Sequence, residues 1–251
     1  MKISLHFGLN AVDPAAYNGW DGWLRACEND AIGSLAAAAL AGFSGRAILT
    51  ADATCDRWRR EVSDALANLN AGDTLWITHS GHGWQRDNGV VGGQQEGICL
   101  YDGLIADSEF HNLLALACPD SNVIVDFDTC HSGGMDRAYD PFIRGRAAHA
   151  LVVRSLTLPP VLSRDTVSAN VLIRAACQPD QTALDGTQNG AWTESLLEDF
   201  NALYQEQAGL TWGGWFDVAA KQCAMKHPSQ VPALKSPGAD TTLLRATLVT
   251  A

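Results

Sequence analysis

Residues 122–133 read NVIVDFDTCHSG, an apolar run that passes directly into a polar segment ending in glycine. The apolar part, rich in Val and Ile, is typical of a strand buried inside a parallel sheet. A second stretch of this kind, LWITHSGHG at residues 75–83, also ends in polar residues and glycine. Because open parallel sheets bind ligands beyond the carboxyl ends of their strands, the two stretches predict that Cys130 and His82 meet at one edge of a sheet.

Strand-like and helix-like segments alternate along the rest of the chain. Strands are also expected at residues 3–8, 47–49, 171–173 and 243–249, with a short strand or hairpin arm at 98–101. Helices are expected over residues 21–42, 54–70 with Thr54 as the cap, 107–117, 193–204 and 215–225. Residues 87–97 and 131–168 have the composition of loops. The alternation predicts an α/β protein with a mainly parallel sheet of about six strands and helices on both faces.

Length and composition indicate one globular domain. The chain has 251 residues, of which 47% are hydrophobic, and a formal net charge of −11 that argues against nucleic acid and anionic membranes as partners. Residues 1–10 resemble a strand rather than a secretory signal, and no stretch approaches the roughly 18 apolar residues of a membrane helix. The seven cysteines form no C-x-x-C motif and their spacings do not pair, which favours a reduced, cytoplasmic protein.

Cys130 and His82 are a candidate nucleophile and general base. A thiol with a pKa of about 8.5 is a poor nucleophile at neutral pH unless a neighbouring base or charge favours the thiolate. Histidine titrates near neutral pH, and the glycines beside both residues allow a substrate backbone to approach closely. Cysteine and histidine at strand ends also serve as ordinary packing residues, so these residues alone leave a catalytic and a structural interpretation open.

Six segments resemble, in chain order, those of the metacaspases and their bacterial relatives. HSGHG at residues 79–83 and DTCHSG at 128–133 match the signatures S-G-H-G and D-x-C-H-S-G. LRACENDA at 24–31 is similar to L-x-G-C-x-N-D-A, with Ala26 in place of glycine. CQPDQTA, GAWT and HPSQVP, at residues 177–183, 190–193 and 227–232, resemble later family segments. The resemblance implies a caspase-like three-layer sandwich in a single domain, 1–251, with a p20-like part (1–130), an intervening loop (131–168) and a p10-like part (169–251).

The resemblance also implies a cysteine endopeptidase with a Cys–His dyad. Cys130 would attack the scissile carbonyl, His82 would be the base, and the backbone N–H groups of Gly83 and Cys130 would form the oxyanion hole. His79 and His131 are rival bases, but they are expected to point away from the cleft. The histidine of the S-G-H-G signature corresponds to His82 and to neither of these two residues.

The substrate pocket follows from the same motifs. Asp30 and Asp128, with Cys27 and Ser80 as smaller neighbours, correspond to the S1 pocket of metacaspases, which holds the residue before the scissile bond. Two carboxylates in one cleft favour a guanidinium or ammonium group, so the resemblance implies cleavage after Arg in preference to Lys and none after Asp.

Calcium binding is left open. Many metacaspases bind Ca²⁺ through loop aspartates, and Asp102, Asp107 and Asp136 fall in roughly the corresponding regions. Residues 87–97 offer only Asp87 and Glu96, however, whereas Ca²⁺ takes about six or more oxygen ligands. No cofactor is required for the dyad chemistry, so calcium would at most activate the enzyme.

Activation and partners are open as well. The segment 131–168 holds several arginines at which an Arg-specific enzyme could cut itself: Arg137, Arg144, Arg146, Arg154 and Arg164. We expect a monomer that acts on peptide or protein substrates and that a separate partner could activate. The alternatives are a catalytically silent caspase-like interaction module, a peptidase of the same fold that recognises Asn or Asp, and a flavodoxin-like binding protein. The last would need a glycine-rich phosphate loop, which residues 8–11 lack.

Overall fold

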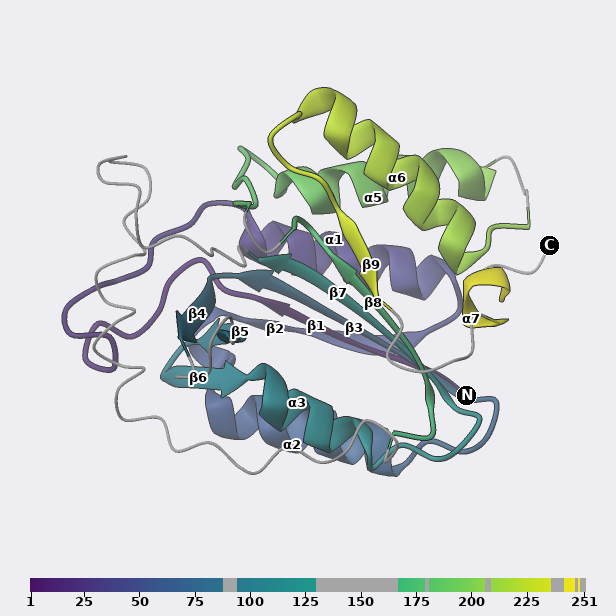
Figure 1. Cartoon of the computed structure of the whole chain (residues 1–251), viewed down its shortest axis with the longest axis horizontal. Coiled ribbons are helices and arrows are strands. Elements are labelled where there is room, and N and C mark those ends of the chain that lie inside the picture. The colour runs from purple at the N-terminus through teal and green to yellow at the C-terminus, as the bar shows by residue number, and fades with distance from the viewer. Residues whose placement is uncertain are drawn as a thin grey trace.

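A six-stranded sheet forms the centre of the computed structural model (Figure 1). The structure describes residues 1–87, 94–129, 167–178, 181–205, 209–235, 242–246 and 248. The strand order is β2-β1-β3-β7-β8-β9, and every neighbouring pair is parallel except β8 and β9. The bounds are β1 Lys2–Gly8, β2 Ser44–Leu49, β3 Thr74–Gly81, β7 Asn122–Thr129, β8 Asn170–Ala175 and β9 Ala233–Lys235.

Helices cover both faces of this sheet, which confirms the predicted three-layer arrangement. On one face lie α1 (Cys27–Leu40), α5 (Ala191–Gln205), α6 (Trp212–Lys226) and α7 (Thr242–Arg245), and on the other α2 (Cys55–Ala67) and α3 (Asp107–Leu114) (Figure 1). A short 3-10 helix, η1 (Thr50–Asp52), precedes α2. Thr54 caps α2 as predicted, because its hydroxyl accepts a hydrogen bond from the Arg57 N–H at 3.3 Å.

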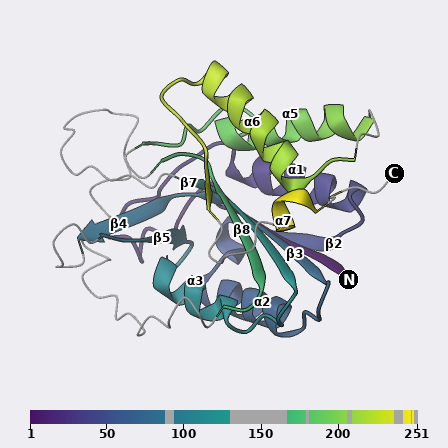
Figure 2. The ribbon, with the colours of Figure 1, turned by 45° about the vertical axis from the view of Figure 1, so that its right-hand side comes forward.

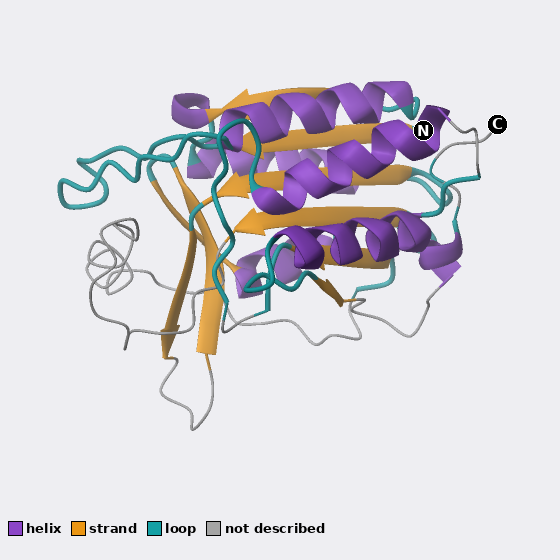
Figure 3. Ribbon diagram, turned by 90° about the horizontal axis from the view of Figure 1, so that it is seen from above, coloured by secondary structure: helices purple, strands orange, loops and turns teal. Residues whose placement is uncertain are grey.

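The two central strands bury side chains on both faces, and this explains their continuous apolar runs. On β3, Leu75 and Ile77 belong to the core beneath α2 and α3, whereas Trp76 belongs to the core beneath α5 and α6. Ile124 of β7 likewise packs on the side opposite its neighbours in sequence. The strand arrowheads point toward the edge that carries the long loops, and the N-terminus lies at the opposite end (Figure 3).

The prediction of a loop at residues 87–97 was wrong in part, because strands of a small second sheet occupy the ends of this stretch. The sheet consists of β4 (Gly83–Asp87), β5 (Gln94–Leu100) and β6 (Gly103–Ala106), and it extends beyond the carboxyl ends of the central strands (Figure 2). Polar side chains interact across this sheet: the Gln85 amide on β4 donates to the Glu96 carboxylate on β5 at 2.9 Å. Gly97 is required there, since a Cβ would lie 2.0 Å from the Ile105 carbonyl oxygen. Its polar, glycine-containing composition is therefore compatible with a strand.

Two further expectations were wrong. Residues 243–249 were expected to form the last strand, but α7 occupies Thr242–Arg245, and the last strand in the described part of the chain is β9, inside the proline-rich stretch. The apolar Leu243 and Leu248 are buried in the core beneath α6, while β9 pairs with the free edge of β8. The first helix begins at Cys27 rather than at residue 21, because Gly22 has a φ of +56° and turns the chain. The intervening loop lies outside the described residues except for 167 and 168.

Candidate active site

The register of β3 and β7 brings the two sequence motifs to one edge of the sheet. Ser80 lies opposite Asp128, and Gly81 lies opposite Thr129, on adjacent parallel strands. In the sequence, His82 follows the end of β3 directly and Cys130 follows the end of β7. Cys130, His131 and Asp136 lie outside the described residues. The predicted oxyanion donor Gly83 is the first residue of β4.

His82 is held by the loop that precedes α1. Its Nε2 lies 2.9 Å from the Gly22 carbonyl oxygen, and its ring centroid lies 4.7 Å from that of Trp20. A neutral imidazole that donates Nε2–H to this carbonyl has Nδ1 as its basic nitrogen. The backbone is also fixed, because the Cys99 N–H donates to the His82 carbonyl at 2.8 Å. Sequence analysis missed Gly22, although Asp21-Gly22 is a turn signal.

His79 has the properties of a core residue. It is 1% exposed, and its ring packs 6.5 Å from that of Phe7. Burial lowers the pKa of His79 to about 3, and neither ring nitrogen has a hydrogen-bond partner among the residues that the structure describes. These surroundings keep the ring neutral and favour His82 as the base.

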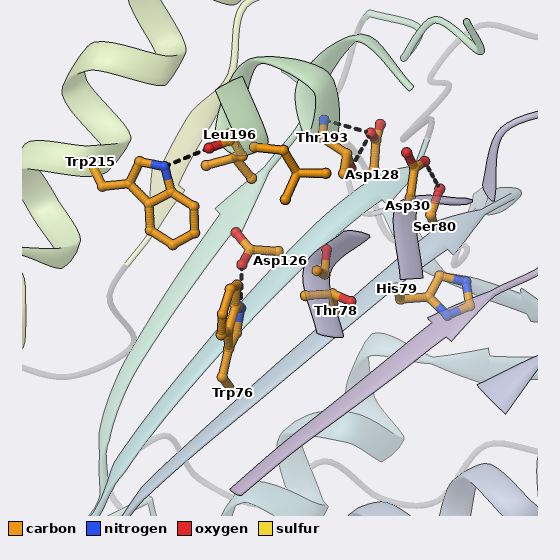
Figure 4. A pocket seen from close by; sticks show the side chains of 12 residues that line it. Asp30, Trp76, Thr78, His79, Ser80, Asp126, Asp128, Thr193, Leu196 and Trp215 are labelled. Carbon is orange, nitrogen blue, oxygen red and sulfur yellow. Dashed lines mark hydrogen bonds between the residues drawn. The ribbon is translucent and has the colours of Figure 1, made fainter. Parts of the chain in front are cut away.

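Asp30 lies in the first turn of α1 and accepts several hydrogen bonds. Its Oδ2 accepts the Ser80 hydroxyl at 2.6 Å (Figure 4). Its Oδ1 accepts the Asn189 side-chain amide at 2.9 Å and the Gly190 N–H at 3.0 Å. Only 2% of Asp30 is exposed. The end of β3 and the segment before α5 therefore hold this carboxylate in one orientation.

Asp128 lies at the end of β7 and caps α5. Its Oδ2 accepts the Thr193 N–H at 3.0 Å and the Thr193 hydroxyl at 2.8 Å (Figure 4). A carboxylate at this position is favoured by the exposed N–H groups at the start of a helix. Residues 190–193, which resemble a family segment, therefore contact both acids: Gly190 bonds Asp30 and Thr193 bonds Asp128.

The carboxylates of Asp30 and Asp128 face the same point. A Cβ placed on Gly190 would lie 2.5 Å from the Asp128 Oδ2 and 3.2 Å from the Asp30 Oδ2, so only glycine fits between them. Both acids line a cavity of about 10 Å³, close to the minimum space for one water molecule. Of the four predicted pocket residues, Asp30, Asp128 and Ser80 line this cavity, and Cys27 lies one turn before Asp30 on α1.

Burial and mutual repulsion change the protonation of this pair. Burial and, after it, the Asp128 charge raise the pKa of Asp30 to about 8, against the lowering effect of the hydrogen bonds from Ser80 and Asn189. Burial likewise raises the pKa of Asp128 to about 6, opposed by Thr193. The two groups titrate as a pair, and a cation between them would favour the doubly ionised form. Burial also raises the pKa of the Cys27 thiol well above its usual range, so this cysteine stays a neutral neighbour.

A buried ion pair lies deeper along the same face. Arg174 of β8 donates from Nε and Nη2 to the two oxygens of Asp126, at 2.6 and 2.7 Å, and the Trp76 indole donates to the same carboxylate at 2.7 Å. The Arg174 guanidinium also lies 4.3 Å from the centroid of the Trp215 ring. This pair was not predicted from the sequence. Its only signal there is that each apolar run contains one charged residue, Asp126 in the first and Arg174 in the second.

The predicted calcium ligands are not gathered in the described part of the chain. The Asp102 carboxylate accepts the Cys55 N–H at the start of α2, at 2.7 Å. The Asp107 carboxylate accepts the Ser108 N–H at the start of α3, also at 2.7 Å. Across the described ranges, no group of three or more His, Cys, Asp or Glu side chains could hold a metal ion. Asp136, the third candidate, lies outside the described residues, so calcium binding stays a prediction.

Comparison with known proteins bears on this arrangement. A family model described as the caspase domain matches residues 12–237. Metacaspase-1 of Schizosaccharomyces pombe is 38% identical over 97 residues, an alignment that covers 36% of this chain and only 22% of that protein. The crystal structure of protein GSU0716 from Geobacter sulfurreducens has a TM-score of 0.80 and 28% identity, and covers 99% of this chain and 98% of its own.

A caspase shares the fold at lower identity. The crystal structure of Caspase-1 from Spodoptera frugiperda has a TM-score of 0.58 and 12% identity, covering 93% of this chain and 85% of that one. In the described parts of the chain, none of the helices has the length and apolar character to cross a membrane.

Proposed function

The chain belongs to the caspase-domain family, and from this premise we propose that it is a cysteine endopeptidase that cleaves after basic residues. The observation that carries the specificity is the pair of buried acids, Asp30 and Asp128, whose carboxylates face one point beside Gly190. Within the described residues, the recorded hydrogen bonds to these carboxylates all come from neutral donors. A cationic substrate side chain supplies the charge that this pocket lacks.

In the proposed reaction, Cys130 and His82 act as a dyad. The Nδ1 of His82 takes the proton of the Cys130 thiol, and the thiolate attacks the scissile carbonyl carbon. The backbone N–H groups of Gly83 and Cys130 donate to the oxygen of the tetrahedral intermediate. His82 then returns the proton to the leaving amine, and water hydrolyses the acyl-enzyme. The Gly22 carbonyl keeps the ring oriented and stabilises its protonated form, since it accepts Nε2–H throughout.

Arginine is the preferred residue because of its shape as well as its charge. A guanidinium presents a planar set of donors that can bond two carboxylates at once, whereas an ammonium is a compact point charge. The side chain of an acidic residue would be repelled by the same pocket. No step of this mechanism passes through a metal ion.

A positional peptide library tests the catalytic residue and the specificity together. Wild type is expected to cleave after Arg, more slowly after Lys, and not after Asp or Asn. Cys130→Ala and His82→Ala should abolish cleavage. Cys118→Ala, which changes a half-buried cysteine after α3, should leave it unchanged. Absence of thiol-dependent cleavage would instead favour the catalytically silent interaction module.

A further inference from the structure

The segment formed by residues 184–190 lies along the start of α1, and we call it the clamp segment. Three of its members contact α1 directly: the Gln188 carbonyl accepts the Asn29 side-chain amide at 2.9 Å, and Asn189 and Gly190 donate to Asp30. The segment is closed at its base, because the Ala191 N–H donates to the Leu184 carbonyl at 3.0 Å. It therefore holds one of the two pocket acids from outside the helix.

Asp185 makes the remaining contact of the clamp segment with the chain before α1. Its Oδ2 accepts the Arg25 N–H at 2.8 Å, and its Oδ1 accepts the Ala26 N–H at 3.1 Å. Ala26 is the N-cap residue of α1, and no side-chain cap hydrogen bond is made there from α1's own sequence. Asp185 supplies a carboxylate at this helix terminus from a distant part of the chain.

Asp185 does not line the cavity between the pocket acids. Its carboxylate instead accepts hydrogen bonds from two backbone N–H groups, one of which belongs to the fully buried residue Ala26. A buried N–H that loses its acceptor is unfavourable, so removal of this carboxylate weakens the attachment of the start of α1 to the clamp segment, although the hydrogen bonds of Asn29 and Asp30 with that segment remain. Asp30, one turn into that helix, would then be held less tightly at its distance from Asp128.

We propose that Asp185 is a positioning residue for the basic-residue pocket: by bonding Arg25 and Ala26 it fixes the start of α1, and with it Asp30, against the clamp segment. This inference rests on the proposed function. It predicts an effect on substrate binding that depends on hydrogen-bond acceptance rather than on charge alone. Asp185 acts through α1 and does not touch the substrate side chain.

Kinetics on an Arg peptide test the inference with three variants. Asp185→Ala should raise KM by about five- to thirtyfold, with a smaller change in kcat. Asp185→Asn keeps one acceptor oxygen and should recover part of this loss. Gln188→Ala is the matched control in the same segment, because only its backbone carbonyl is used, and it should behave as wild type.

A purely electrostatic role makes the opposite prediction. Asp185 also raises the pKa of Asp128 through its charge, so it could act on the substrate at a distance. In that case Asp185→Asn would be as impaired as Asp185→Ala, and both losses would disappear at 1 M salt, where the screening length is about 3 Å. That pattern would overturn the positioning role.

Amide hydrogen exchange gives a readout that does not need activity. Exchange in peptides covering residues 24–31 should be faster in Asp185→Ala than in wild type, while exchange in β3 and β7 stays unchanged. Unchanged exchange together with unchanged KM would overturn the proposal. If Asp185→Ala does not fold, Asp185→Asn carries the same two measurements. A wild type that fails to cleave basic peptides, with faster exchange in Asp185→Ala, would overturn the proposed function and support the clamp.

Discussion

Asp126 and Asp128 lie two residues apart on the same face of β7, and their surroundings differ in one respect. Asp126 faces Arg174, which donates two hydrogen bonds to it, so this carboxylate is neutralised within the fold. Among the described residues, Asp128 accepts hydrogen bonds only from the neutral donors of Thr193, and it faces a second acid, Asp30. A buried carboxylate with its own cation holds strands together. A buried carboxylate without one is suited to bind a cation that arrives with a ligand.

The largest effect is expected from breaking the complete pair. Arg174→Met removes the guanidinium and leaves Asp126 as an uncompensated buried charge. The free energy of unfolding should fall by about 3–5 kcal/mol, measured by urea denaturation. Arg60→Met, at an exposed position on α2, is the control and should change stability little. A loss below about 1 kcal/mol would mean that the two carboxylates do not differ as described.

Neutralising the incomplete pair should affect activity rather than stability. Asp30→Asn and Asp128→Asn each relieve repulsion between buried acids, so the free energy of unfolding at pH 7 should stay constant or rise. Cleavage of Arg peptides should fall by about 100-fold in kcat/KM, because a buried partner of the substrate charge is lost. Asp64→Asn, exposed on α2, is the matched control. Destabilisation without loss of cleavage would assign these acids a structural role.

The pH dependence sharpens the same contrast. Because the raised pKa values of Asp128 and Asp30 are about 6 and 8, the empty pocket binds a proton at low pH that a cationic side chain must displace. KM for an Arg peptide should therefore fall as pH rises from 6 to 8, by up to about tenfold per unit.

Rising pH should improve substrate binding but lower the stability of the fold, and the effect on stability should extend over a wider pH range. Above about pH 4 the unfolded chain has released protons that the folded pair retains. The free energy of unfolding contributed by the pair therefore falls as pH rises from about 4 toward 8. Thermal melts of wild type and Asp30→Asn across this range measure it. Parallel curves for the two proteins would contradict the shared-proton interpretation.

The smallest effect is expected from a calcium chelator. The Asp102 and Asp107 carboxylates each accept a backbone N–H at a helix start, and they belong to no acidic cluster in the described residues. EDTA should leave kcat/KM for an Arg peptide unchanged. A loss of activity that added Ca²⁺ restores would require ligands beyond these two.

The parts of the fold that were predictable are those in which local pattern and burial agree. The apolar runs of β3 and β7 are buried on both faces, so their strands and the shared edge followed from composition. The last strand was misplaced because the apolar residues there serve the core without a strand: Leu243 lies in the short helix α7 and Leu248 in the chain after it, and both are buried. Only the open edge of β8, which β9 occupies, decides between the two.

The site shows the same division. Asp30 and Asp128 were found because each stands in a recognisable motif. Asp185 accepts the backbone N–H of the distant residue Arg25, and Gly22 offers its own carbonyl to His82. Because one partner in each contact is a backbone group, the residue types along the chain do not reveal either contact. The partnership of Asp126 with Arg174 depends on the register of β7 and β8, which place these residues opposite each other. Register is a property of the folded sheet, so no local pattern contained it.

The clamp segment also sets the order in which the proposed enzyme becomes competent during synthesis. Both residues of the proposed dyad leave the ribosome before residues 184–193, which supply hydrogen bonds to Asp30 and Asp128. Until that later part has emerged and folded, a nascent chain has the proposed nucleophile and base but lacks the donors that hold one side of the acidic pocket. In the proposed enzyme, substrate binding would therefore begin only after residues 184–193 have been made and have folded against the first half of the chain.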